Sequence, residues 1–177
     1  MQEQQKINND QHINPYQDIE NWMQGNLITI AVSFNSNEIS DEEATKIATA
    51  IRTESGPVDI KFFSTPMSSF AISQILGALH NNNYVESLTM KDVGISFDDG
   101  KVIAELLINN SKLQYLDISN NNLGMGIYQV GRAFDHNKTL RTININNNGI
   151  KETLCSLFMI KCHQSRVRNC PINVINN

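Results

Sequence analysis

Two segments of the chain repeat one spacing of apolar residues, and this repetition restricts the fold more than any other feature of the sequence. Residues 113–123 follow the pattern L-x-x-L-x-I-x-x-N-x-L, and residues 140–150 repeat it as L-x-x-I-x-I-x-x-N-x-I. Equal steps backwards from Leu113 reach Val85, Pro57 and Thr29, and apolar residues follow each of them at corresponding positions. A regular period of this length predicts a protein built from stacked copies of one structural unit.

Each predicted unit consists of a short strand, a turn and a helix. The first part of a unit alternates apolar with other residues, as a strand with one buried face does. The second part places apolar residues at positions i, i+3, i+4 and i+7, which form one face of a helix. The helical sets are Ala44/Ile47/Ala48/Ile51, Ile72/Ile75/Leu76/Leu79, Gly100/Ile103/Ala104/Leu107, Ile127/Val130/Gly131/Phe134 and Cys155/Phe158/Met159/Cys162. Ser40 with Glu43, and Ser96 with Asp99, have the spacing of capping boxes at helix starts.

Neither the strand nor the helix of a unit can bury its apolar face alone, so the units must stack into a parallel sheet backed by parallel helices. Strands lie about 4.8 Å apart, whereas helices need about 10 Å. The stack should therefore bend, with the strands on its inner, concave side. The fold prediction is an α/β solenoid, a right-handed horseshoe arc of about five 27–28-residue repeats that start near residues 29, 57, 85, 113 and 140.

We expect the repeats to occupy residues 29–168, with a cap at each end. Residues 1–14 are polar and are expected to be a disordered tail, and residues 15–28 are expected to form the N-terminal cap. Residues 169–177 are expected to form an incomplete C-terminal strand and cap, with Ile172 and Val174 as its apolar residues. Pro171 lacks a backbone donor, which blunts an exposed sheet edge, so the chain is expected to be a monomer.

The repeat pattern resembles the leucine-rich-repeat family, and in particular its ribonuclease-inhibitor-like subfamily, whose helical repeats have about 28–29 residues. The resemblance covers roughly residues 27–175 and is strongest at 113–150. The signature asparagine of the family is present at Asn37, Asn121 and Asn148, but Thr65 and Val93 replace it in the second and third repeats. Thr can still form a hydrogen bond with the backbone and Val cannot, so the turn at Val93 must be held in another way.

Charge and composition exclude several classes of partner. The chain has a net charge of -4 and no basic run, so it is a poor candidate for nucleic-acid binding, which needs clustered Lys and Arg. No apolar stretch approaches the roughly 18–20 residues that span a membrane, and the polar N-terminus lacks the features of a secretory signal. Three cysteines form no disulfide framework and fit a reducing compartment. We expect the chain in the cytoplasm, or delivered into a host cell without a classical signal peptide.

Neither a metal site nor a catalytic site has strong support. Cys155, Cys162, His163 and Cys170 invite interpretation as metal ligands. Cys155 and Cys162, however, occupy helix positions that face the core in other units, where a free Cys acts as a small hydrophobe. His163 points about 100° away from Cys162 on a helix. No Walker-type loop, H-E-x-x-H, G-x-S-x-G or paired C-x-x-C motif occurs. We therefore expect core cysteines, no bound metal, no cofactor and no catalytic residue.

The resemblance implies that a partner protein lies against the concave strand face, where strand side chains that alternate with the core residues point. Phe63 and Tyr115 are the aromatic residues among them, and aromatics are common interface anchors. Lys61 and Lys91 are expected on adjacent strands in the same column or nearly so. The predicted partner-binding residues are Asp59, Lys61, Phe63, Thr89, Lys91, Tyr115, Asp117 and Asn144.

These observations favour a protein–protein interaction module that binds another protein. By resemblance, the chain is a candidate bacterial effector that acts on a host protein. The alternative hypothesis is an inhibitor or activator of an enzyme, like the ribonuclease inhibitors or the GTPase-activating members of the family. A GTPase activator needs a well-placed polar or Arg residue on a repeat edge, and no such residue stands out. An enzyme that uses the Cys/His cluster is the last of the hypotheses.

Overall fold

The computed structural model describes residues 31–35, 38–53 and 56–170 of the 177-residue chain. The predicted tail and N-terminal cap, within residues 1–28, lie outside the described residues, and so do Asn37, Pro171, Ile172 and Val174. Strands and helices alternate along the described part. This arrangement confirms the prediction of an α/β fold with parallel strands.

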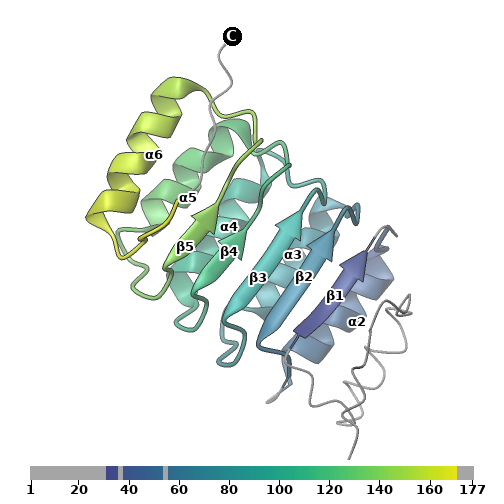
Figure 1. Ribbon diagram of the computed structural model, residues 1–177. Helices are drawn as coiled ribbons and strands as arrows, with labels where there is room; N and C mark the ends of the chain where they lie inside the picture. Colours follow the sequence, from purple (N-terminus) through teal and green to yellow (C-terminus); the bar gives the residue numbers. More distant parts are fainter. Residues whose placement is uncertain (1–30, 36–37, 54–55, 171–177) are drawn as a thin grey trace, which may run out of the picture.

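Five parallel strands form one sheet, in the order of the sequence (Figure 1). They are β1 (Ala31–Asn35), β2 (Asp59–Phe63), β3 (Ser87–Lys91), β4 (Tyr115–Asp117) and β5 (Thr142–Asn144). Each strand begins just after a repeat start that the sequence predicts. Ile60, Leu88, Leu116 and Ile143 consequently pair in one row across the sheet. The sheet is therefore one continuous ladder, in which residues one repeat apart in sequence become neighbours.

All the helices cover the same face of the sheet (Figure 1). They are α2 (Asp41–Ile51), α3 (Ser69–Ala78), α4 (Asp99–Asn109), α5 (Ile127–Ala133) and α6 (Glu152–Gln164), and a short 3-10 helix, η1 (Gly124–Gly126), precedes α5. Their predicted apolar sets are buried, except for the partly exposed Met159. None of the described helices is long and apolar enough to cross a membrane. The face of the sheet that turns away from the helices is called the strand face below.

The strand pattern resumes after α6. Val167 and Cys170, which stand one repeat spacing after two core residues of the preceding unit, pack against the core. Asn169 forms a parallel bridge with Thr142, and the backbone N–H of Ile143 donates to the Asn169 carbonyl over 3.0 Å. Asn169, in the segment predicted as a C-terminal strand, thus lies beside β5, and residues 171–177 lie outside the described part of the chain.

The two predicted capping boxes have different outcomes. At α2 the box is complete, because the Ser40 hydroxyl accepts from the Glu43 N–H at 3.3 Å and the Ser40 N–H donates to Glu43 Oε2 at 2.6 Å. At Ser96 only half of it forms, and both the N–H and the hydroxyl of Ser96 donate to Asp99 Oδ2 at 2.7 Å. The Ser96 hydroxyl is therefore a donor to a side chain rather than an acceptor for the helix backbone. α4 begins only at Asp99, so the prediction of a full box is wrong there.

Two glycines explain why the fourth unit is shorter than the units before it. Gly126 in η1 lies against Gly100 at the start of α4, and a Cβ atom on Gly100 would stand 2.6 Å from the Gly126 carbonyl oxygen. A Cβ atom on Gly126 would stand 2.7 Å from the carbonyl oxygen of Phe97. Only glycine permits backbones to approach this closely. The fourth unit is shorter than the preceding units at the tight η1 turn, which is followed by a helix of only 7 residues.

Asparagine side chains join the turns after β4 and β5 to the units before them. Asn121 Nδ2 donates to the Met90 carbonyl at 2.8 Å, and its Oδ1 accepts from the backbone N–H groups of three consecutive residues that begin at Val93. Asn148 Nδ2 donates to the Ile118 carbonyl at 2.8 Å in the same way. Each amide therefore satisfies backbone groups of its own turn and of the preceding unit, which would otherwise be buried without partners.

In the two units that lack this asparagine, other hydrogen bonds hold the turn after the strand, as the sequence suggests. The Thr65 hydroxyl lies 3.2 Å from the Phe34 carbonyl oxygen of the preceding unit and 2.9 Å from the Phe63 carbonyl oxygen. Val93 has no such group, and its backbone N–H is instead held by Asn121 from the following unit. The expectation that the Val93 turn is held by other means is therefore confirmed.

A second asparagine ladder runs along the opposite edge, where the helices end. Asn82, Asn110 and Asn137 are 8%, 4% and 6% exposed. Their Nδ2 atoms donate to carbonyl oxygens of the preceding unit, those of Ile51, Leu79 and Leu107, at 2.8, 2.6 and 2.6 Å. Each Oδ1 accepts from the backbone N–H groups two and three residues later. Asparagine amides thus join consecutive units at both edges of the solenoid, and all of them except the half-buried Asn121 are buried.

We expect Asn148→Ala to lower the free energy of unfolding by about 2–3 kcal/mol, because it leaves buried carbonyls and an N–H without partners. The matched control is Asn122, an exposed asparagine in a neighbouring turn. Asn122→Ala should change the free energy of unfolding by less than about 0.5 kcal/mol. Urea unfolding followed by circular dichroism measures both values. Equal effects of the two substitutions would contradict the role of the ladder.

Candidate functional site

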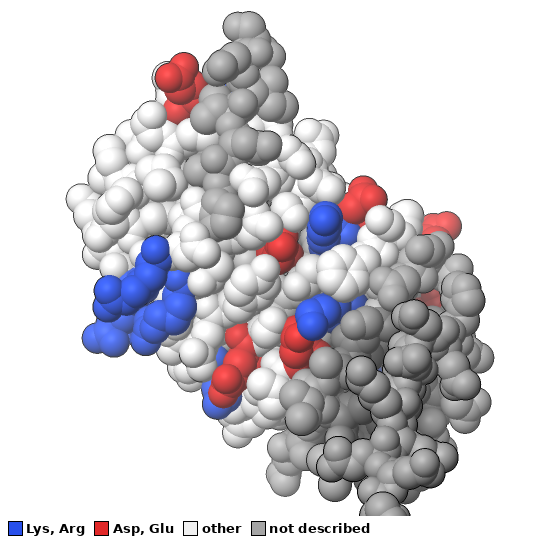
Figure 2. Space-filling view, in the orientation of Figure 1, with Lys and Arg blue, Asp and Glu red and all other residues white. Residues whose placement is uncertain are grey.

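The strand face arranges its side chains in columns, because every second residue of a strand points away from the helices. The first column contains Asp59, Ser87, Tyr115 and Thr142. The second contains Lys61, Thr89, Asp117 and Asn144, and the third contains Phe63 and Lys91. All eight residues predicted to bind a partner therefore lie in these columns. Figure 2 shows acidic and basic side chains interspersed across the middle of this face.

The register places the two lysines on adjacent strands in neighbouring columns, within the expected range. Lys91 on β3 pairs with Phe63, whereas Lys61 on β2 pairs with Thr89. The two ammonium groups therefore belong to different columns and are diagonal neighbours. Lys61 forms an ion pair with Asp59 along its own strand. Lys91 makes no ion pair with any residue that the structure describes, so its charge is available to an acidic group of a partner.

Asp117 is the centre of a hydrogen-bonded cluster on β4 and β5. Its Oδ2 accepts from Asn144 Nδ2 at 2.8 Å and from the Tyr115 hydroxyl at 3.3 Å. Its Oδ1 accepts from the backbone N–H of Ser119 at 2.8 Å. Three donors therefore fix this carboxylate, one on β4, one on β5 and one in the segment that follows β4. The cluster holds the Tyr115 ring and the Asn144 amide in defined positions on the strand face.

The electrostatics of the same cluster keep the Tyr115 hydroxyl protonated. Partial burial raises the pKa of Tyr115, and the negative charges of Asp117 and Asp59 raise it further. A neutral phenol beside a carboxylate is a donor. Tyr115 thus presents a partly exposed ring to a partner, while its hydroxyl donates to Asp117.

Accessibility divides the eight predicted residues into two groups. Thr89 and Asp117 are only 4% and 8% exposed, which corrects the expectation that all eight can touch a partner. Both occupy the middle of the second column, where neighbours on two strands cover them. The accessible residues are Asp59, Lys61, Phe63, Lys91, Tyr115 and Asn144, all partly exposed. Asp59 also retains a buried oxygen, Oδ1, without a hydrogen-bond partner among the described residues.

The cysteines belong to the core rather than to the strand face. Cys155 and Cys162 are 4% and 3% exposed, and Cys170 packs against the same core. His163 is exposed, and its Nδ1 lies 2.7 Å from the Met159 carbonyl oxygen. Within the described part of the chain, no three His, Cys, Asp or Glu side chains are grouped as metal ligands would be. Core packing is therefore the interpretation that geometry supports for these thiols.

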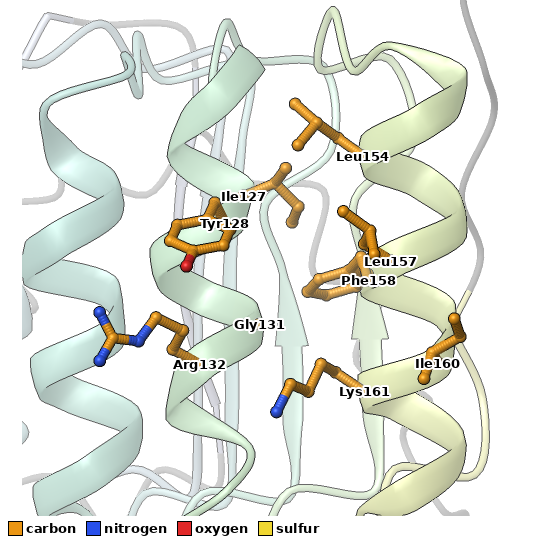
Figure 3. Close-up of a pocket in the computed structure, with 9 residues that line it drawn as sticks. All are labelled: Ile127, Tyr128, Gly131, Arg132, Leu154, Leu157, Phe158, Ile160 and Lys161. Atoms are coloured by element: carbon orange, nitrogen blue, oxygen red, sulfur yellow. The ribbon is translucent and has the colours of Figure 1, made fainter.

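A groove that the sequence did not predict lies between α5 and α6, on the side of the molecule opposite the strand face (Figure 3). Ile127, Tyr128, Leu154, Leu157 and Phe158 are among the residues that line it. Leu157 and Tyr128 lie outside the predicted core sets. Large apolar residues outside the core-facing positions of these helices were the sequence signal that could have indicated the groove.

Comparisons with known proteins agree with the geometry. The leucine-rich-repeat model matches residues 112–131, so a leucine-rich repeat is present in the chain. A protein phosphatase 1 regulatory subunit 37 homolog of Caenorhabditis elegans is 38% identical over 61 residues, which are 34% of this chain and 6% of that protein. The chain therefore spans only a small part of that relative. The structure of leiomodin-1 actin-binding site 2 superposes with a TM-score of 0.64 at 18% identity, over 84% of this chain and 91% of the other. That likeness shows the fold.

The thiols should differ in reactivity. A hydrogen bond between Cys162 and Cys170 raises the pKa of Cys162, together with burial, and lowers the pKa of Cys170. Burial raises the pKa of Cys155. Because the thiolate is the reactive form, iodoacetamide at neutral pH should label Cys170 first. Peptide mass spectrometry measures the order, and urea should expose all three thiols. Labelling of Cys155 or Cys162 as fast as Cys170 in the folded protein would contradict this arrangement.

Proposed function

We propose that this chain is a protein–protein interaction module whose strand face binds a partner protein. One observation carries the proposal: Phe63, Lys91 and Tyr115 are accessible on one face of a rigid sheet, and the Asp117 cluster fixes Tyr115 in place. Aromatic side chains held in defined positions lose little entropy on binding. A free ammonium group beside an aromatic ring, as with Lys91 and Phe63, suits a partner that offers an acidic residue next to an apolar one.

The comparisons support a protein-binding role in general terms. The matched relatives are, by name, a regulatory subunit and an actin-binding site, and both names describe proteins that act on other proteins. Within this role we propose a ribonuclease-inhibitor-like solenoid of five repeats with caps. The regular spacing of the strands along the chain supports that subdivision. We propose that the chain is monomeric and non-enzymatic, and that it acts in the cytoplasm. We also propose delivery into a host cell by a bacterium, which rests on the resemblance of the repeats to effector-type chains.

The second candidate function is regulation of an enzyme. The 38% identity to a protein phosphatase 1 regulatory subunit homolog favours it, since a regulatory subunit also binds a protein. The two candidates differ in what the partner does once it is bound. Adding the chain to the identified partner and measuring that partner's activity separates them, because a passive module leaves the activity unchanged.

Interface size sets a further expectation. A standard interface uses about 20–30 residues on each side, which is more than the columns of the strand face offer. The partner should therefore also contact the turns that follow the strands. Ser64, Asp92, Asn120 and Asn147, all with positive φ, present their side chains there.

We expect Phe63→Ala and Tyr115→Ala each to weaken partner binding by about 1 kcal/mol or more, as the loss of an interface anchor does. Because both side chains are partly exposed, each substitution should cost no more than about 1 kcal/mol of stability. The matched controls are the buried neighbours Phe62 and Leu116, both 0% exposed. Their truncation to Ala should cost about 2–5 kcal/mol of stability through cavity formation.

Calorimetric binding to a partner identified by cross-linking, together with thermal melting, measures all four variants. Normal melting combined with normal binding of Phe63→Ala and Tyr115→Ala would remove the strand face as the functional surface and leave the fold intact. Severe destabilisation by Phe63→Ala and Tyr115→Ala, with mild effects of Phe62→Ala and Leu116→Ala, would contradict the register itself.

A further inference from the structure

The outer helical surface of the last two units exposes large apolar side chains at one groove. Tyr128 on α5 is 55% exposed, and Leu157 and Ile160 on α6 are 56% and 52% exposed. All three line the groove between the two helices, which has a volume of about 150 Å³. An apolar hollow of this volume holds a group about the size of benzene. Surface apolar residues are usually scattered singly, and their grouping around a hollow marks an interaction site.

The groove exists because α5 has a residue without a side chain on the surface that faces α6. Gly131 takes the middle of the facing side of α5, and a Cβ atom there would stand 3.3 Å from the Phe158 ring. Figure 3 shows Phe158 and Lys161 extending from α6 into the space between the helices, with Leu154 at the opposite end from Lys161. The floor is thus formed by a glycine and an aromatic ring, and the walls are formed by the exposed side chains of Tyr128 and Leu157.

Basic residues adjoin the end of the groove at which the helices finish. Lys161 bonds Asp135 Oδ1 at 2.7 Å, and Lys138 Nζ donates to the Asp135 carbonyl oxygen at 3.1 Å. Arg141 Nη1 donates in turn to the Lys138 carbonyl oxygen at 3.2 Å, and the Arg168 N–H donates to the Arg141 carbonyl oxygen at 2.7 Å. These contacts join the groove to the start of β5, where basic side chains gather (Figure 2).

We call the residues Arg132, Lys138, Arg141, Arg166 and Arg168 the cationic band. Within the described part of the chain none of these five forms an ion pair. Asp135, between Arg132 and Lys138 in sequence, is already paired with Lys161. A chain of net charge -4 therefore carries a local excess of positive charge at one end of its apolar groove. Charge of one sign beside a desolvated pocket selects partners of the opposite sign.

We propose that this groove is a second docking site, for a polypeptide segment whose apolar residues fill the space between α5 and α6 and whose acidic residues face the cationic band. The site lies on the opposite side of the molecule from the strand face, so it is independent of the function proposed above. A protein segment fits better than a nucleic acid, because most of the side chains that line the groove are apolar and suit apolar side chains rather than phosphates. An amphipathic helix with anchors at i, i+3/i+4 and i+7 is the expected form of the segment.

The test uses the full chain and a fluorescent synthetic peptide of about 18 residues, with Leu and Phe along one helical face and four Glu at one end. Fluorescence anisotropy should show saturable binding that weakens as salt is added. Leu157→Ser should weaken binding about tenfold or more, as the loss of an anchor does. Ile108→Ser is the matched control, because Ile108 is 47% exposed on α4, outside the groove, and its replacement should leave affinity unchanged.

The cationic band is tested separately. Arg132→Ala combined with Arg141→Ala should lower the affinity several-fold and flatten the salt dependence, and a peptide with Lys in place of Glu should bind at least about tenfold more weakly. Phe63→Ala should bind the peptide as the unaltered chain does. This result separates the groove from the strand face, so failure of one proposal leaves the other standing.

Several outcomes would overturn the proposal. These are absence of binding at about 1 mM chain, equal effects of Leu157→Ser and Ile108→Ser, and equal affinity for the Glu and Lys peptides. Loss of peptide binding in Phe63→Ala would move the segment to the strand face. The last measurement adds vesicles that contain phosphatidylserine to the chain with the bound peptide. If they bind the chain and displace the peptide, the apolar groove and its cations serve a membrane surface, and the proposal fails.

Discussion

The structure depends on hydrogen bonds that pass from each unit to the unit before it through asparagine side chains that are buried or half-buried. A stacked repeat leaves turn carbonyls and N–H groups at both edges without strand or helix partners, and burying such groups unpaired is costly. Asn121 and Asn148 satisfy them where the strands end. Asn82, Asn110 and Asn137 satisfy them where the helices end. The apolar core holds helices against the sheet, but these amides fix the register of one unit on the next.

The sequence predicts the fold well because the fold is periodic. A constant repeat spacing places each strand residue beside the residue at the same position of the next unit. The pairing of one strand therefore predicts the pairing of the following strands. The helical sets follow from the i, i+3, i+4, i+7 rule, and Met159 alone departs from it. The asparagines at the helix ends could not be recognised as buried from local sequence, because an asparagine in a polar loop normally faces solvent. Their burial is decided by a carbonyl group of the preceding unit, which local sequence does not reveal.

The binding surface is less predictable, for a physical reason that particular residues illustrate. Alternation assigns Thr89 and Asp117 to the strand face correctly, but their accessibility depends on the side chains of two flanking strands. Thr89 and Asp117 have short side chains with a neighbour on each side, whereas the larger side chains of Phe63 and Tyr115, on strands that are also flanked on both sides, remain partly open. The groove between α5 and α6 depends on even finer detail, since it arises from the absence of a side chain at Gly131 opposite Phe158. The periodicity of the sequence predicts the direction in which each side chain points, whereas packing between units determines which side chains a partner can reach.

The two asparagine ladders also limit how such a gene can change in length. A single residue inserted between a ladder asparagine and the strand it adjoins would shift every later amide away from its carbonyl, so most short insertions and deletions should be eliminated by selection. A whole unit could be gained or lost by recombination, because the ladder partners would then be restored in step. The fourth unit shows the exception: its missing residue falls at η1, where the Gly100 and Gly126 backbones meet, just after the Leu123 N–H that donates to the Asn148 side chain. The chain can therefore vary in length by complete units, or by single residues at the start of a helix.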